Sequence, residues 1–406
     1  MDTTRKPFLD MEHTEQMSPQ EKLVKTHKEN YRRSIGIPRE LSPDENRVPL
    51  VPSSVSVLVA NGHQVIVQAG AGLRANFADI EYVESGAIIV QSAEEAFRAE
   101  IVLKVAPLFD SEIEYLKPRQ VLISSIQAVT HCKDYFKKLL ARKITALAFE
   151  AIKDESGAYP VLKAMSEIVG TTSVLIAAEY LADPLLGRGS MLGGFPGVNP
   201  SEIVIIGAGT VGEYAARTAL GMGAMVKVFD DNIYKLRNIQ HHLGVRLFTS
   251  IIQPEVLNKS LRTADVAIGA VHSKECITPL YVSEENVRMM KKGAVIIDIS
   301  IDQGGVFATS KPTTHSNPVY SLHDVTHYCV PNIASKVPHT ASYALSNLFA
   351  PILNRMNEAS TFEVFLKRNS SFRQGVYMLN GTLTSKFIGD YYQIPYKDIE
   401  LLMAAF

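Results

Sequence analysis

The stretch from residue 201 to 232, SEIVIIGAGTVGEYAARTALGMGAMVKVFDDN, constrains the fold of this 406-residue chain more than any other. Its apolar run at 203–206 is short and β-branched, which is typical of a buried parallel strand. A glycine-rich turn follows, then a segment rich in small residues that predicts a helix, and then a second strand at 225–229. This order predicts a Rossmann βαβ unit that binds a dinucleotide.

Each glycine of the turn has an expected role. Gly207 is expected to allow the tight turn, and Gly209 to let the backbone approach a pyrophosphate. Gly212 is expected to let the helix pack closely against the strand. The first amides of the helix then face the phosphates. The residues predicted to bind the cofactor in this turn are Gly207, Gly209, Thr210, Val211 and Gly212.

The second strand ends at Asp230, which follows Gly212 by 18 residues. An acid at about this spacing binds the hydroxyl groups of the adenosine ribose. A carboxylate there also repels the 2′-phosphate of NADP, so the sequence predicts NAD as the cofactor. Asp231 is adjacent and stays open as an alternative for this role.

Composition narrows the class of protein. Lys and Arg total 41 against 42 for Asp and Glu, so no net charge favours nucleic acid or an acidic membrane as partner. The cysteines, Cys132, Cys276 and Cys329, have no metal-binding spacing, and no metal site is expected. Reduced thiols, no run of about 20 apolar residues and no signal peptide together predict a cytoplasmic protein without membrane contacts.

Short apolar runs alternate with amphipathic or polar stretches before the glycine turn. The expected strands are 34–37, 65–68, 87–90, 101–105, 121–124 and 145–149. This alternation predicts an α/β fold with a parallel sheet covered by helices on both faces. Gly70-Ala71-Gly72 lacks a third glycine at the required spacing, so we interpret it as a turn.

Two long helices are expected on either side of the glycine turn. The first covers 163–181 and is interrupted at Gly170; the second covers 338–356, with a kink at Pro351. Strands at 245–248, 265–271, 294–300 and 328–330 complete six for a dinucleotide fold. The sequence therefore predicts two Rossmann-like, doubly wound domains. The NAD-binding domain, 163–338, is inserted in a substrate domain formed by 31–162 and 339–406, and residues 1–30 form an N-terminal extension. The substrate cleft is expected between the domains.

Several motifs resemble the alanine dehydrogenase and pyridine-nucleotide transhydrogenase family. They are IGIPRE at 35–40, ENRVPLVP at 45–52, GHQVIVQAGAG at 62–72, MSEIVG at 165–170, GGFPGV at 193–198, GAGTVG at 207–212 and DISIDQGG at 298–305. The motifs IDQGG and MSE resemble the alanine dehydrogenase branch of this family more than the transhydrogenase branch. The likeness extends from Ser34 to the C-terminus.

The resemblance implies roles for individual residues. Arg47 matches the arginine that binds the substrate carboxylate, and a guanidinium suits a bidentate grip on an amino or keto acid. Asp302 matches an aspartate at the nicotinamide end of the cleft. Met165, Ser166 and Asn332 match positions that line the nicotinamide, and Asp230 matches the ribose acid.

Two positions depart from the family pattern. The family has lysine-valine-lysine-glutamate-proline, with the second lysine on the substrate, but residues 104–107 read Lys-Val-Ala-Pro, so Ala106 replaces that lysine. Gln127 replaces the family's catalytic histidine, and an amide cannot shuttle a proton near neutral pH. Rescue by Lys104 or His131 stays open, and His323 and His327 are further candidates.

The resemblance implies NAD-dependent oxidative deamination of L-alanine to pyruvate and ammonia by a homohexamer. Because the lysine and histidine are replaced, we expect turnover to be very slow or absent. Two alternatives remain: an NAD(H)-binding protein without dehydrogenase activity, and a dehydrogenase for another amino or imino acid.

Overall fold

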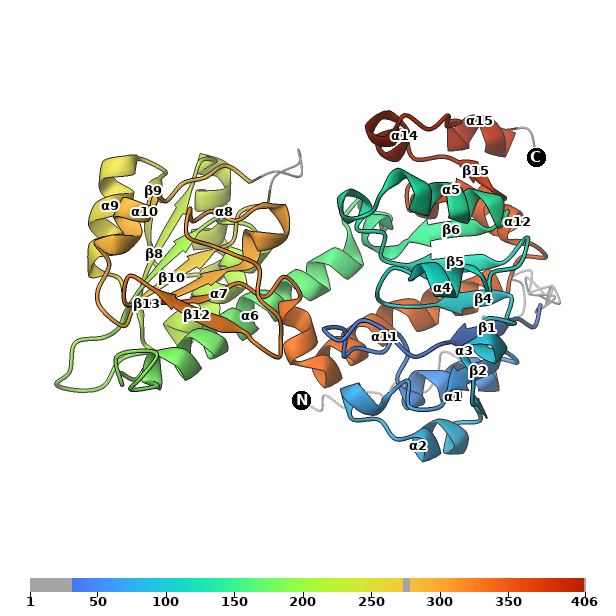
Figure 1. Cartoon of the computed structure of the whole chain (residues 1–406), viewed down its shortest axis with the longest axis horizontal. Coiled ribbons are helices and arrows are strands. Elements are labelled where there is room, and N and C mark those ends of the chain that lie inside the picture. The colour runs from blue at the N-terminus through green and yellow to red at the C-terminus, as the bar shows by residue number, and fades with distance from the viewer. Residues whose placement is uncertain (1–30, 273–277, 405–406) are drawn as a thin grey trace, which may run out of the picture.

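The computed structural model describes residues 31–272 and 278–404, and these residues form two α/β units side by side (Figure 1). The predicted N-terminal extension lies outside the described residues. Each unit is built on a mainly parallel sheet flanked by helices, which confirms the predicted fold class.

The first sheet has the strand order β15-β14-β6-β5-β4-β1-β2-β3. Its strands are β1 (Ser34–Ile37), β2 (Gln64–Gln68), β3 (Ile88–Val90), β4 (Ile101–Leu103), β5 (Val121–Ser124), β6 (Thr145–Ala148), β14 (Val376–Leu379) and β15 (Thr382–Leu383). The six strands β1 to β6 lie within two residues of the predicted bounds and pair in parallel. We call this unit the substrate domain.

The sequence analysis did not predict the two C-terminal strands of this sheet, β14 and β15. It predicted a mixed helical tail instead. β14 pairs antiparallel with β6 and with β15. The turn between β14 and β15 is Asn380-Gly381, with φ of 47° and 79°. Asn-Gly between two apolar runs is a strong hairpin signal, so this feature was present in the sequence.

The second sheet has the order β12-β13-β11-β10-β7-β8-β9. Its strands are β7 (Glu202–Ile206), β8 (Met225–Asp230), β9 (Phe248–Ile251), β10 (Val266–Gly269), β11 (Val295–Asp298), β12 (Val319–Leu322) and β13 (Val325–Tyr328). The parallel strands follow the Rossmann order. β9 starts three residues later than predicted, β13 starts three residues earlier, and β12 is an additional antiparallel edge strand. We call this unit the nucleotide domain.

Two long helices link the domains, α6 (Pro160–Ala182) and α11 (Pro338–Met356), and α6 runs from one domain to the other (Figure 1). The predicted interruption of α6 at Gly170 is wrong, because the helix is continuous there. A Cβ on Gly170 would lie 2.4 Å from the Val211 carbonyl oxygen. Glycine is therefore needed for the close packing of α6 against α7 (Thr210–Gly221).

Helix α6 is also long and apolar enough to cross a membrane by length and composition alone. It packs against α7 and α11, and 39% of its most apolar window is buried inside the structure. The core helix of a soluble protein passes the same test, so this observation is weak evidence for a membrane.

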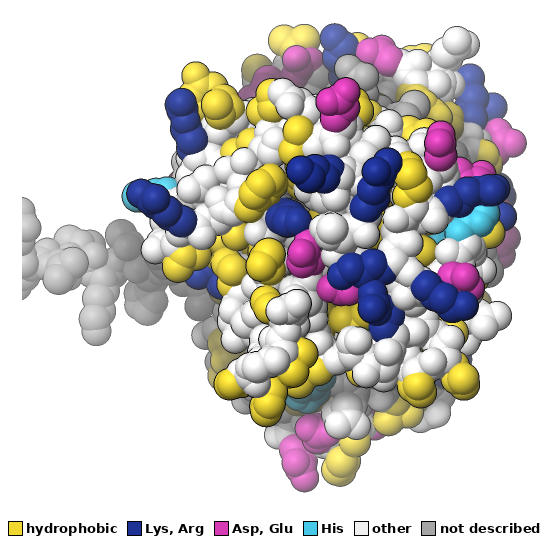
Figure 2. All heavy atoms as spheres, turned by 90° about the vertical axis from the view of Figure 1, so that its left-hand side faces the viewer, with side chains coloured by type: hydrophobic (Ala, Val, Ile, Leu, Met, Phe, Trp, Pro, Cys, Tyr) yellow, Lys and Arg dark blue, Asp and Glu magenta, His cyan; other side chains and the backbone are white. Residues whose placement is uncertain are grey.

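The other helices cover the sheets and the ends of the strands. In the substrate domain they are α1 (Pro52–Ala60), α2 (Asp79–Glu84), α3 (Ala93–Ala96), α4 (Asp110–Ile113), α5 (Lys133–Ala141), α12 (Phe362–Arg368), α13 (Ser370–Arg373), α14 (Lys386–Tyr392) and α15 (Ile399–Ala404). In the nucleotide domain they are α8 (Ile233–Leu243), α9 (Pro254–Thr263) and α10 (Glu284–Arg288). Figure 2 shows the outer end of the nucleotide domain, where Lys and Arg side chains are spread among acidic and hydrophobic ones.

Candidate active site

The glycine turn between β7 and α7 has the geometry of a pyrophosphate-binding loop. Gly207 has φ of +113°, and a Cβ there would lie 2.3 Å from the Ala270 carbonyl oxygen. A Cβ on Gly212 would lie 1.9 Å from the Gly207 carbonyl oxygen, so only glycine lets α7 pack this closely on the turn. At Gly209, by contrast, a Cβ would meet no atom within 4 Å. The space beside Gly209 is open to a ligand that approaches the backbone.

Helix α7 begins at Thr210 directly after this turn, and no side chain caps its N-terminus. The amides of Thr210 and Val211 are therefore not occupied by a capping side chain. Uncapped amides together with the helix dipole favour an anion at this end. The turn and the helix start thus fit the diphosphate of a dinucleotide.

Asp230 ends β8 beside the same turn and is only 4% exposed. Its Oδ2 accepts a hydrogen bond from the Ala208 amide at 2.7 Å, and its Oδ1 accepts one from the Asn232 amide at 2.8 Å. A hydrogen bond to Asp230 is the main cause that raises the pKa of the neighbouring Asp231. Asp230 therefore holds the end of the strand against the glycine turn.

A cavity of about 660 Å³ lies between the two domains, as expected for the substrate cleft. The substrate domain contributes Asp44, Glu45, Ala106, Gln127 and His131 to its lining, and the nucleotide domain contributes Thr313, Val330, Pro331 and Asn332. Ala106 and Gln127 follow β4 and β5, so the cavity lies at the carboxyl ends of parallel strands, where open α/β sheets bind ligands.

Arg47 is held beside this cavity by a carboxylate that the sequence reasoning missed. Glu45 accepts hydrogen bonds from Arg47 Nε at 2.7 Å and from Arg47 Nη2 at 2.6 Å. The other terminal nitrogen, Nη1, lies 3.5 Å from Met165 Sδ. Burial raises the pKa of Glu45, but Arg47 outweighs it and the net shift is downward, so the carboxylate is charged. Nη1 is thus the group of Arg47 with donors left for a substrate carboxylate.

Glu45 also connects the domains. Its Oε2 accepts a hydrogen bond from Asn332 Nδ2 at 3.0 Å, and Asn332 belongs to the nucleotide domain. Asn332 is one of the residues that the resemblance places at the nicotinamide, and the structure brings it to the cavity beside Glu45 and close to Arg47. The spacing Glu-x-Arg at 45–47 was the signal that could have identified Glu45.

Lys104 does not reach this cavity, which corrects the expectation that it could replace the missing lysine. Its side chain is fully buried, and its Nζ lies 2.5 Å from Glu112 Oε1 and 3.4 Å from Glu40 Oε2. These carboxylates outweigh burial and raise the pKa of Lys104. Two buried partners satisfy the ammonium away from the cavity, which gives Lys104 a structural role.

The partner Glu40 makes the stability of this cluster depend on pH. Burial raises its pKa from 4.5 to about 7, against the opposing charge of Lys104. The folded state then binds the proton more tightly than the unfolded state. The resulting stabilisation is complete below pH 4.5 and is lost as the pH rises through 7. We expect the melting temperature of the native protein, relative to Glu40→Gln, to fall between pH 4.5 and 7.5. Parallel melting curves for the two proteins across this range would contradict this assignment.

Ala106 and Gln127 both line the cavity, so the replaced positions do face the site. Gln127 has φ of 42° and ψ of 53°, a left-handed conformation that is uncommon outside glycine. The half-buried Glu150 accepts a hydrogen bond from the adjacent Ile126 amide at 2.7 Å and fixes this part of the loop. The cavity therefore receives a methyl group and an amide where the resemblance implies a cation and an imidazole.

None of the candidate histidines takes the position of Gln127 in the cavity wall. The His131 ring stacks on Tyr135 at 3.9 Å, its Nε2 is shielded from solvent without a partner among the described residues, and burial lowers its pKa. His327 bonds to Thr309 at 2.8 Å inside the nucleotide domain, and His323 pairs with Glu284 at 2.8 Å. Of the three, His131 contributes to the cavity wall.

The remaining predicted residues, Asp302, Met165 and Ser166, are not part of the described cavity wall. Asp302 lies in a 3₁₀ turn, Ile299–Gln303, directly after β11. Burial raises its pKa, against the opposing effect of His272. Met165 and Ser166 lie on the first turns of α6, half-buried. The structure joins Met165 to Arg47, but the described contacts do not bring Asp302 or Ser166 into the same cavity.

Two Rossmann-like domains, a pyrophosphate-type loop and an arginine held by Glu45 beside the interdomain cavity together define the class of dinucleotide-dependent two-domain proteins. Comparison with known proteins gives the family. The alanine dehydrogenase/PNT N-terminal domain model matches residues 36–169, and the corresponding C-terminal domain model matches residues 173–386. The chain belongs to the alanine dehydrogenase/PNT family.

Individual relatives agree with this family. An alanine dehydrogenase of Mycolicibacterium smegmatis is 37% identical over 373 residues, 91% of this chain and 100% of the relative. An alanine dehydrogenase of Methanococcus maripaludis is 37% identical over 368 residues, 90% of this chain and 98% of the relative. A solved L-alanine dehydrogenase superposes with a TM-score of 0.83 at 34% identity, covering 89% of this chain and 99% of that one. A transhydrogenase from Sinorhizobium meliloti, with a TM-score of 0.73 and 23% identity over 87% of this chain and 99% of its own, shares the fold.

Proposed function

We propose that this protein is an NAD-dependent oxidoreductase that converts L-alanine to pyruvate and ammonia, with a low rate of turnover. Two features occur together and carry the proposal: the glycine turn is open to a dinucleotide, and Glu45 orients Arg47 beside the interdomain cavity. Membership of the alanine dehydrogenase/PNT family supports the same substrate class.

The overall reaction balances as L-alanine, NAD⁺ and water giving pyruvate, ammonium, NADH and one proton. NAD, when bound, supplies the acceptor for the hydride that leaves Cα. Before that hydride leaves, the ammonium group of the substrate must lose a proton, and the nitrogen lone pair then forms the C=N bond. Water adds to the resulting imine carbon, and the C–N bond breaks to release ammonium. A side chain that accepts the first proton is worth about 10²–10⁴ in rate.

The residues of this chain supply positioning more than proton transfer. In the proposal Arg47 Nη1 binds the substrate carboxylate, while Glu45 holds the guanidinium in place. Asn332 would line the nicotinamide of bound NAD, and its hydrogen bond to Glu45 ties that side of the cleft to the substrate domain. Asp302 is the acid/base matched by the family pattern. Gln127 and Ala106 occupy the family's proton-transfer and cation positions and provide neither function.

Two further features belong to the proposal as finer statements. The alanine dehydrogenase relatives support a small amino or keto acid as the partner, and we extend this to a cytoplasmic homo-oligomer. The domain limits predicted from sequence, 31–162 with 339–406 and 163–338, stay part of the proposal. The positions of β14, β15 and α11 support them.

A second candidate function is an NAD(H)-binding protein without dehydrogenase activity, and Ala106 and Gln127 in the cavity wall favour it. A third is a dehydrogenase for another amino or imino acid. Formation of NADH with a panel of amino acids separates the three. L-alanine as the best substrate supports the proposal, a different best substrate supports the third candidate, and no NADH with any amino acid supports the second.

Cofactor preference is a direct test of the nucleotide site. We expect NADH to bind at least tenfold more tightly than NADPH, because the Asp230 carboxylate at the end of β8 repels a 2′-phosphate. Asp230→Ala should reduce this difference, whereas Asp231→Ala should preserve it. Fluorescence titration of both cofactors measures the ratio. Equal affinity of the native protein for NADH and NADPH would remove Asp230 from this role.

A further inference from the structure

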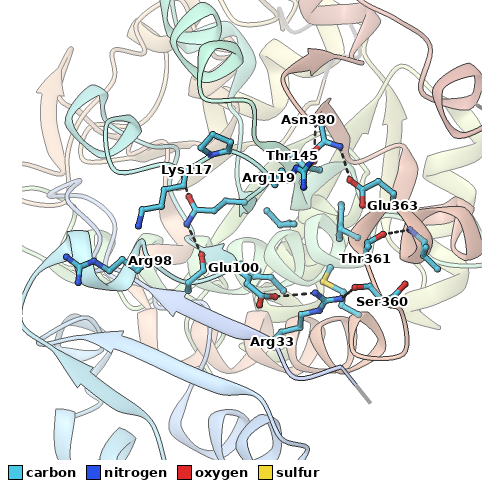
Figure 3. Close-up of a pocket in the computed structure, with 18 of the residues that line it drawn as sticks. Arg33, Arg98, Glu100, Lys117, Arg119, Thr145, Ser360, Thr361, Glu363 and Asn380 are labelled. Atoms are coloured by element: carbon cyan, nitrogen blue, oxygen red, sulfur yellow. Dashed lines mark hydrogen bonds and ion pairs between the residues drawn. The ribbon is translucent and has the colours of Figure 1, made fainter. Parts of the chain in front are cut away.

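A second cavity, of about 800 Å³, lies in the substrate domain at the edge of the sheet opposite the candidate active site (Figure 3). Its walls include residues that precede or begin the parallel strands: Arg33 before β1, Glu100 before β4, Arg119 before β5 and Thr145 in β6. The segment from Met356 to Lys367 and the hairpin residue Asn380 form the other wall. This cavity shares no lining residue with the interdomain cavity.

The charge of this cavity is positive. Its cationic residues are Arg33, Arg98, Lys117, Arg119 and Lys367, against the carboxylates Glu100 and Glu363. Both carboxylates are already engaged. Glu100 lies 3.2 Å from Arg33, and Glu363 accepts a hydrogen bond from Asn380 Nδ2 at 2.8 Å. Arg98 is also paired, with Glu94 at 3.2 Å. Two cations are therefore in excess over the three carboxylates, which concentrates anions in a concave site.

Arg33 is held in one position by the backbone. Arg33 Nη2 donates to the carbonyl oxygens of Ala359 and Ser360, both at 2.7 Å, and the side chain is 18% exposed. Lys117 and Arg119, in contrast, are exposed and lie on the opposite side of the cavity from Arg33 (Figure 3). Because Arg33 is already paired with Glu100, Lys117 and Arg119 are the adaptable cations available to an anion that carries more than one negative charge.

The cavity also has an apolar surface, contributed by Ile101, Val121, Met356, Phe362 and Val364. Its volume falls within the range of small-molecule sites, which is about 300–1,000 Å³. Inorganic ions alone would leave this surface exposed to water. The chemistry favours a small organic anion in which an apolar body is joined to a phosphate or to several carboxylates.

We propose that this cavity binds such an organic polyanion, separately from the substrate and the cofactor. β4 and β5 start at this cavity and lead to Ala106 and Gln127 at the other edge of the sheet. The proposal does not depend on the proposed function, because it concerns binding to the substrate domain alone.

Calorimetric titration of the full-length protein with four probes tests this site: phenyl phosphate, inorganic phosphate, citrate and acetate. The titrations are run with saturating NADH, since the glycine turn also attracts phosphate. We expect phenyl phosphate or citrate to bind at least tenfold more tightly than inorganic phosphate and acetate. The stronger of the two identifies the source as a phosphate ester or a polycarboxylate.

Reversing the charge of Lys117 and Arg119 tests whether the probe binds in this cavity. Lys117→Glu with Arg119→Glu should weaken binding of the stronger probe at least tenfold. The matched control, Lys137→Glu with Lys259→Glu, makes the same change of charge at exposed positions outside the cavity and should preserve it. Equal melting temperatures of the two variants show that both fold. Absence of binding by all four probes, or equal binding by both variants, would overturn the proposal.

Discussion

Gln127→His combined with Ala106→Lys is expected to raise the rate of L-alanine oxidation about 10²–10⁴-fold over the native protein. The histidine would accept the proton from the substrate ammonium, and the lysine would stabilise charge on the reacting heteroatom. Both positions line the cavity beside Glu45, so the new side chains would face the site. The left-handed backbone of Gln127 also accepts histidine, a residue type enriched in that conformation.

A matched control changes the same two positions without adding their chemistry. Gln127→Asn combined with Ala106→Met introduces neither a base nor a cation, and asparagine also tolerates the left-handed conformation. This variant should remain at the native rate. Brisk turnover by the native protein would contradict the account and point to His131, the histidine in the cavity wall.

Arg47→Ala is expected to have the second largest effect, because it removes two interactions at once. Loss of a charge-assisted hydrogen bond to the substrate carboxylate, worth about 1.5–3 kcal/mol, should raise the KM for alanine and pyruvate about 10–150-fold. Glu45 would also lose its partner while only 4% exposed. A buried charge left unpaired costs about 3–5 kcal/mol of folding stability.

These two effects can be separated with variants of the same pair. Arg47→Ala combined with Glu45→Ala removes the unpaired carboxylate, so stability should partly recover while the KM stays high. NADH affinity, measured by fluorescence, should change little in the double variant, since its glycine turn is intact. An unchanged KM in a folded Arg47→Ala protein would show that Arg47 serves the structure and does not bind substrate.

The fold was predictable because its signals are local. The β-branched runs of 203–206 and 121–124 and the spacing of Gly207, Gly209 and Gly212 each determine backbone geometry within a few residues. Gly170 shows the limit of this reasoning. Glycine is required there by the close approach of Val211, which is distant in sequence. From the sequence alone, a glycine needed for this packing could not be told from one that interrupts the helix.

The site was predictable only in part, because charge pairing across the fold is not local. The sequence placed Arg47 and Asn332 in one cleft, and the structure joins them through Glu45. The sequence left Lys104 as a candidate for the cleft. Nothing near Lys104 in the sequence shows whether its ammonium pairs with a buried carboxylate or binds the substrate. Glu40 and Glu112 supply that partner from two other segments.

The most direct test of the central proposal follows the hydride itself. The native protein and the Gln127→His, Ala106→Lys variant are incubated at high concentration with NAD and L-alanine deuterated at Cα, and the cofactor is examined by mass spectrometry. A dehydrogenase forms deuterium-labelled NADH, slowly with the native protein and faster with the variant. Absence of labelled NADH with both proteins, although both bind NADH, would contradict the proposed function and leave a nucleotide-binding protein without dehydrogenase activity.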